Sequence, residues 1–172
     1  MKNTYIIFWV LLLLYVQNTY AQNSNAFSIK AGVGVSDFTA TPFGEDGCYT
    51  YKLGASYEFR LNKTFGVEPS LFLTSKGGGY IRWKYLELPI CGVAHVGKWS
   101  FFLGPYFSCG LSKYDEDIRE SENRCDIGLD VGVRHHWNRL SLGMDFTHGF
   151  VNFMKEFDSK IRHFTIVLGY TI

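Results

Sequence analysis

Three glutamates occur where acid–base chemistry could take place. Glu58, Glu68 and Glu87 lie in neighbouring segments of the sequence, and paired carboxylates can act as a general acid and a general base. The same carboxylates could instead form ion pairs with basic residues on neighbouring segments. We favour ion pairs, because the sequence shows no route for a substrate, and we assign no catalytic residue.

Histidine and hydroxyl side chains offer a second possible chemistry. His163 and Thr165 are two residues apart, so they share one face of a strand, and Ser28 could adjoin them on a neighbouring strand. A histidine beside a hydroxyl can activate it as a nucleophile, as in an enzyme that modifies envelope lipid. His135 and His136 would point to opposite faces of a strand, which disfavours a shared metal site. We therefore assign no metal-binding or cofactor-binding residue.

The four cysteines lack the spacing of zinc ligands, but two of them could form a disulfide. Cys109 and Cys125 are symmetric about residue 117, so a hairpin centred there would place them opposite each other on the same face. Cys48 is a rival partner for Cys125, and buried thiols that pack as small apolar side chains are the third alternative.

Alternation of apolar and polar residues is the main signal for secondary structure. It predicts eight strands, and it leaves short turns at 61–64, 97–98 and 137–138 and longer links at 38–48, 76–82, 113–124 and 150–160. The predicted strands cover residues 27–37, 49–60, 65–75, 83–96, 99–112, 125–136, 139–149 and 161–172. Short turns at one end and longer links at the other are typical of an up-and-down transmembrane barrel.

Charged residues of these segments are confined to one face. Every second residue of each segment forms a face without Asp, Glu, Lys, Arg or His. The opposite face contains ten charged residues, which we predict to form an interior network that plugs the lumen: Lys30, Lys52, Glu58, Arg60, Glu68, Glu87, Asp126, Asp130, Arg134 and Asp145.

The period alone does not decide which face points outward, and a soluble periplasmic ligand-binding barrel would show the same alternation. Two features favour an apolar exterior. The polar face is rich in Gly, Ser and Thr, as a narrow eight-stranded interior requires. Trp99 and Trp137 fall at short turns, where aromatic residues would meet a membrane interface. The predicted fold is therefore all-β, an eight-stranded antiparallel transmembrane barrel.

The first residues are typical of a signal peptide. Lys2 precedes an apolar run from Tyr5 to Val16, which is too short to span a bilayer, and small residues place cleavage between Ala21 and Gln22. We expect residues 1–21 to be the signal peptide and residues 22–172 to be the barrel domain. The chain of 172 residues has a formal net charge of +1, which gives no reason to expect nucleic-acid binding.

Several short motifs resemble the PorT-like outer-membrane β-barrel domain family. They include Gly32-Val-Gly-Val-Ser-Asp-Phe38, the stretch from Leu53 to Leu71, Tyr85-Leu-Glu-Leu-Pro-Ile90 and Asp126-Ile-Gly-Leu-Asp-Val-Gly132. The resemblance covers about residues 27–170. It implies the outer membrane of a Gram-negative bacterium, and the named member of the family is linked to protein secretion.

The expected function is therefore that of a non-enzymatic outer-membrane protein, structural or accessory to protein secretion or envelope assembly. Its expected contacts are outer-membrane lipid and an envelope or secretion protein bound through the longer loops. The alternatives are an envelope lipid-modifying enzyme and the soluble ligand-binding barrel.

Overall fold

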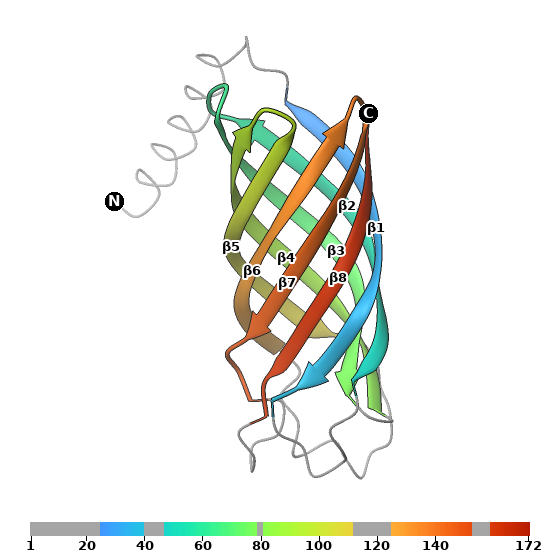
Figure 1. Ribbon diagram of the computed structural model, residues 1–172. Coiled ribbons are helices and arrows are strands. Elements are labelled where there is room, and N and C mark those ends of the chain that lie inside the picture. Colours follow the sequence, from blue (N-terminus) through green and yellow to red (C-terminus); the bar gives the residue numbers. More distant parts are fainter. Residues whose placement is uncertain (1–24, 40–46, 79–80, 112–124, 153–158) are drawn as a thin grey trace, which may run out of the picture.

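Eight antiparallel strands close into a barrel in chain order (Figure 1). The structure, a computed structural model, describes residues 25–39, 47–78, 81–111, 125–152 and 159–172. The strands are β1 (Ala26–Phe38), β2 (Cys48–Arg60), β3 (Phe65–Gly78), β4 (Ile81–Val96), β5 (Trp99–Gly110), β6 (Cys125–Trp137), β7 (Leu140–Gly149) and β8 (Ile161–Thr171). The predicted fold class is confirmed. The predicted signal peptide, with cleavage between Ala21 and Gln22, lies outside the described residues.

The closing seam joins the first strand to the last. β1 pairs with β8 from Ser28 opposite Thr171 to Phe38 opposite Ile161. Because every strand has a neighbour on both sides, the barrel has no open sheet edge whose backbone groups would need other partners. No helix in the described part of the chain is long and apolar enough to cross a bilayer.

The two ends of the barrel differ. The turns at 61–64, 97–98 and 138–139 lie at the same end as the start of β1 and the end of β8 (Figure 1). We call this the short-turn end. The third turn lies one residue later than predicted, because Trp137 is still paired with Leu140.

The longer link predicted over residues 76–82 is wrong. β3 continues to Gly78 and β4 begins at Ile81, so only residues 79–80 separate them. Two contacts explain how glycines continue the strand. The Ser36 hydroxyl donates to the Gly77 carbonyl oxygen at 2.7 Å, and the Phe38 ring occupies the space beside Gly78. The strand gains interior contacts that the low strand propensity of glycine does not predict.

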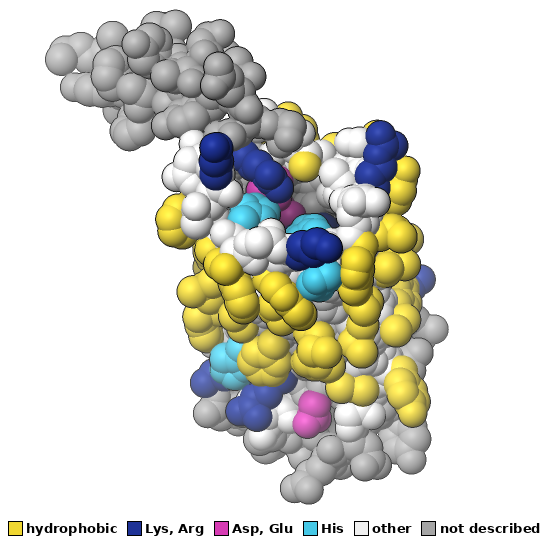
Figure 2. All heavy atoms as spheres, turned by 45° about the horizontal axis from the view of Figure 1, so that its top comes forward, with side chains coloured by type: hydrophobic (Ala, Val, Ile, Leu, Met, Phe, Trp, Pro, Cys, Tyr) yellow, Lys and Arg dark blue, Asp and Glu magenta, His cyan; other side chains and the backbone are white. Residues whose placement is uncertain are grey.

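Exposure alternates along the strands with the predicted parity, except at the end of β3, where residues 74–78 are all buried. Outward positions are apolar and exposed, as in Val33, Leu103 and Leu168, which are 67%, 57% and 55% exposed. Inward positions are buried and mostly polar or charged. On the face shown in Figure 2, apolar side chains form a band across the middle of the barrel, and exposed apolar side chains occur on all eight strands. The arrangement that is usual for a soluble protein is therefore inverted.

The interior also holds two small apolar clusters. Phe38, Tyr85 and Ile161 pack together near the end opposite the short turns, and Cys91, Val93 and Phe102 form the second cluster. The space between and around these clusters is filled by polar and charged side chains.

Inward glycines let neighbouring strands and large side chains approach the backbone closely. A Cβ atom added at Gly34 would lie 1.8 Å from the Phe164 carbonyl oxygen of β8. That oxygen belongs to the backbone and cannot move aside without opening the closing seam.

We predict that Gly34→Val destabilises the barrel by roughly 3 kcal/mol or more, because the new side chain collides with the β8 backbone. Ala31→Val on the exposed outer face of the same strand is the matched control and should change stability by less than about 0.5 kcal/mol. Urea unfolding of protein refolded in detergent micelles measures both. Equal stability of the two variants would contradict the close approach of β1 and β8.

Candidate functional site: the charged barrel interior

All ten charged residues of the predicted network project from the inner face of the strands. Nine of them are buried, and Arg60 is half-buried at the short-turn end. The structure divides them into a central cluster, a cluster around Glu68, a cluster around Glu58, and Asp126, which lies apart from these.

The central cluster is built around Lys52. Its Nζ lies 3.2 Å from Glu87 Oε1, 3.3 Å from Asp145 Oδ2 and 3.7 Å from Asp130 Oδ2. These residues come from β2, β4, β7 and β6, so the ion pairs cross the lumen rather than follow one wall. The ammonium group also lies 4.5 Å from the centre of the Phe72 ring, close enough for a cation–π contact.

Lys76 belongs to the same cluster and was missed by the sequence analysis. It is buried, pairs with Glu87 and lies 4.5 Å from the centre of the Tyr106 ring. Its parity in β3 is that of Glu68, so continuing the alternation two residues further would have found it. The erroneous link at 76–82 removed it from the strand.

The second cluster is built around Glu68. Arg134 donates from Nη1 and Nη2 to the two carboxylate oxygens, each at 2.9 Å, and Lys30 Nζ donates to Oε1 at 2.7 Å. The guanidinium also lies 4.2 Å from the centre of the Phe102 ring. A bidentate pair of this kind fixes the orientation of both side chains and also balances their charges.

The third cluster forms a relay at the short-turn end. Glu58 accepts from Arg60 Nε at 3.1 Å and lies 2.6 Å from His95 Nε2. The Ser100 hydroxyl lies 2.9 Å from His95 Nδ1 and 2.7 Å from His136 Nε2. With His95 neutral, Nε2 donates to the carboxylate, so Nδ1 accepts from Ser100, whose oxygen accepts from His136.

This relay has the order of groups found in serine nucleophiles, namely acid, imidazole and hydroxyl. However, Ser100 is 0% exposed and lies between the two imidazole rings. A substrate carbonyl has no open face from which to reach its oxygen. The arrangement is suited to holding three side chains in fixed orientation rather than to attacking a substrate.

Ser28, which the sequence suggested as a neighbour of His163 and Thr165, does not lie beside them. Ser28 pairs with Thr171 and its hydroxyl lies 2.9 Å from the Thr171 hydroxyl. Thr165 is opposite Gly34, and His163 Nε2 lies 3.1 Å from Thr50 Oγ1. The suggested combination of Ser28, His163 and Thr165 is therefore wrong, because the register of the closing seam places Ser28 at the opposite end of the pairing.

Asp126 is inside the barrel, but its contacts are not those of the ion-pair clusters. The Tyr106 hydroxyl donates to its Oδ2 at 2.5 Å, and the Val151 backbone N–H donates to Oδ1 at 3.2 Å. It anchors the end of β7 and the start of the following link to β5 and β6.

The short-turn end is hollowed into a polar cavity of about 180 Å³, lined by residues of the Glu68 and Glu58 clusters. Histidine, basic and acidic side chains are visible inside its rim in Figure 2. Deeper in the barrel, the ion pairs of Lys52 bridge opposite walls. Among the described residues, no group of three or more Asp, Glu, His or Cys side chains is placed to hold a metal ion.

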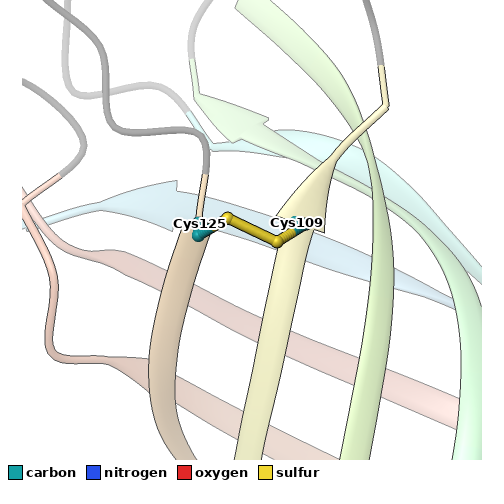
Figure 3. Close-up of a disulfide and its surroundings, with 2 residues drawn as sticks. All are labelled: Cys109 and Cys125. Carbon is teal, nitrogen blue, oxygen red and sulfur yellow. A yellow bond between two sulfur atoms is a disulfide. The ribbon is translucent and has the colours of Figure 1, made fainter.

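The structure joins Cys109 and Cys125 in a disulfide at the end of the β5–β6 ladder (Figure 3). The two residues are directly opposite each other, with Cα atoms 4.2 Å apart. Cys48, the rival partner in the sequence analysis, is buried in β2. The link therefore crosses the base of the segment between β5 and β6.

We predict that Lys52→Met destabilises the barrel by about 3 to 5 kcal/mol, because three buried carboxylates lose their shared cation. Lys98→Met, at an exposed turn, is the matched control and should change stability by less than about 0.5 kcal/mol. Urea unfolding in detergent micelles measures the difference. A Lys52→Met barrel as stable as the control would show that the crossing ion pairs contribute nothing to stability.

We predict that the Cys109–Cys125 disulfide forms in protein isolated from cells without a reducing agent. Trypsin can cleave after Lys113, Arg119 and Arg124, so a non-reduced digest should contain the two cysteine peptides linked together. Replacing both cysteines by serine should cost about 2 to 4 kcal/mol, whereas Cys48→Ser should leave the linked peptides in place. Recovery of the two peptides only as separate species would contradict the prediction.

Comparisons with known proteins support the fold. No protein-family model matches the chain, and no curated protein matches it in sequence. Its structure is similar to Ail, the attachment invasion locus protein of Yersinia pestis, with a TM-score of 0.58 and 17% identity over 87% of this chain and 100% of Ail. That Ail structure is a complex with the heparin analogue sucrose octasulfate, and Ail is an outer membrane protein. Neisserial surface protein A has a TM-score of 0.59 and 10% identity over 86% of this chain and 99% of its own. At these identities the likeness establishes the shared barrel fold.

Proposed function

We propose that this chain is a non-enzymatic barrel of a Gram-negative outer membrane, matured by removal of residues 1–21. The apolar band carries this proposal. Outward positions on all eight strands expose large apolar side chains, while every glutamate and three of the four lysines on the same strands are buried, the exception being the exposed Lys84 of β4. Water would favour the reverse arrangement, so the exterior is suited to hydrocarbon.

Aromatic residues at both ends of the band support a membrane-spanning orientation. At the short-turn end, the centre of the His135 ring lies 4.7 Å from that of Trp99 and 4.2 Å from that of Trp137. At the other end, Tyr49 and Phe150 are exposed. Amphipathic rings prefer the boundary between hydrocarbon and headgroups. We place the short turns and both chain ends in the periplasm, as is usual for such barrels.

The blocked interior argues for a structural or accessory role rather than a diffusion channel. Ion pairs from Lys52 to Asp130 and Asp145 span the lumen, and an eight-stranded barrel leaves little room around them. The likeness to Ail, an outer membrane protein, agrees with a barrel of this class.

The resemblance of several motifs to the PorT-like family supports a more specific role. By that resemblance, the protein is an accessory to protein secretion or envelope assembly and contacts its partner through the longer links between strands. The burial of Ser100 counts against the alternative of a lipid-modifying enzyme.

We expect the protein to fractionate with outer membranes and to change mobility between unboiled and boiled samples in a detergent gel. A closed barrel resists unfolding by detergent until it is heated. The amino terminus of the purified protein should be Gln22. Recovery of the protein in the soluble periplasm, without a mobility shift, would overturn the proposal and favour the soluble ligand-binding barrel.

A further inference from the structure

An apolar groove of about 600 Å³ opens on the outer surface near the short-turn end. It runs over β4, from β3 on one side across β5 to Val131 of β6 on the other. The register explains its shape, because Ala94 is opposite Phe65 on one side and Phe101 on the other, and Gly92 is opposite Leu103. Small residues form the floor and large apolar residues form the walls. Its volume falls within the range of about 300–1,000 Å³ that is usual for ligand sites.

Gly92 is not required by the packing of the barrel. A Cβ atom added there would meet only the Leu103 carbonyl oxygen, at 3.7 Å, which is an ordinary contact. The inward Gly34, by contrast, has no room for a Cβ. A glycine within a strand weakens it, and where no internal contact explains it, the glycine often marks close approach of a ligand.

Two exposed lysines lie in the turns at the end of the groove. Lys63 lies in the turn between groove residues Leu61 and Phe65, and Lys98 lies in the turn that joins β4 to β5. Both residues are exposed, and neither the 61–64 turn nor the 97–98 turn contains an acidic residue. An apolar groove that ends at two cations matches a ligand with a long apolar chain and an anionic head.

We propose that the groove binds one acyl chain of a single anionic glycerophospholipid, whose phosphate is held by Lys63 and Lys98. The inference rests on the proposed membrane location, which brings the groove into contact with lipid chains and the two turns to headgroup level. The acyl chain lies along β4 and covers Gly92 and Ala94, and the walls provided by Phe65 and Phe101 restrict its sideways movement.

Native mass spectrometry of the delipidated protein in detergent tests the proposal, with phosphatidylglycerol and phosphatidylcholine of identical acyl chains as probes. We expect binding of phosphatidylglycerol to saturate at one molecule per barrel, with a Kd about tenfold below that of phosphatidylcholine. Ala94→Phe fills the groove and should raise the Kd of both lipids about tenfold. Gly92→Leu fills it from the neighbouring position and should have the same effect.

Replacing Lys63 and Lys98 by glutamine should remove the preference for phosphatidylglycerol and leave binding of phosphatidylcholine unchanged. Two controls match these variants elsewhere on the barrel. Ala31→Phe adds the same ring to the exposed face of β1, and Arg162→Gln removes an exposed cation at the opposite end. Neither should change the Kd of either lipid.

Binding without saturation, equal effects of Ala94→Phe and Ala31→Phe, or a dimer that Ala94→Phe dissociates would overturn the inference. The last result would assign the groove to a second copy of the chain. A boiled and unboiled gel of each variant separates this failure from that of the proposed function. A barrel that shows the mobility shift but fails the lipid test loses only the groove assignment.

Discussion

The ion pairs that cross the lumen from Lys52 are the interaction on which the rest of the barrel depends. A lysine whose side chain is 0% exposed is costly to bury unless carboxylates surround it. Glu87, Asp130 and Asp145 reach it from three other strands. These contacts require a narrow barrel with a fixed register, because a slip of one residue in any of these strands would turn its charged side chain outward. Closure and charge pairing therefore depend on each other.

The narrow lumen in turn explains the distribution of small and large interior residues. Phe102 lies against Gly132 of the next strand, and its ring also supports Arg134. Tyr106 similarly lies against Gly128, and its ring faces Lys76. Each large ring thus takes space that a glycine leaves free, and each provides an apolar face for a cation. The same aromatic side chains therefore fill the lumen and contact its buried cations.

Alternation was sufficient to predict the eight strands and the face to which each of the ten predicted interior charges belongs, because the outward positions along the middle of the strands are apolar. It could not predict what depends on register across the closing seam. The placement of Ser28 opposite Thr171, away from His163, follows from β1–β8 pairing, which no local pattern encodes. Lys76 was lost because glycines normally end strands, whereas here Phe38 and Ser36 pack on Gly78 and Gly77. The contacts of Ser100 with His95 and His136 join β5 to β4 and β6. They also depend on which residues of neighbouring strands are opposite each other, and alternation does not predict this.

The division of chemistry between the two faces also limits where function can reside. The interior ion-pair clusters join charged side chains of different strands, and even the hydroxyl of Ser100 is enclosed by its histidine partners. A change inside the barrel must therefore preserve charge pairing and volume together. In the proposed membrane location the outer face has no such requirement, since hydrocarbon accepts any apolar side chain of suitable size. An outward position that carries glycine without an internal reason, as Gly92 does, is consequently more informative about binding than any charged residue of the lumen.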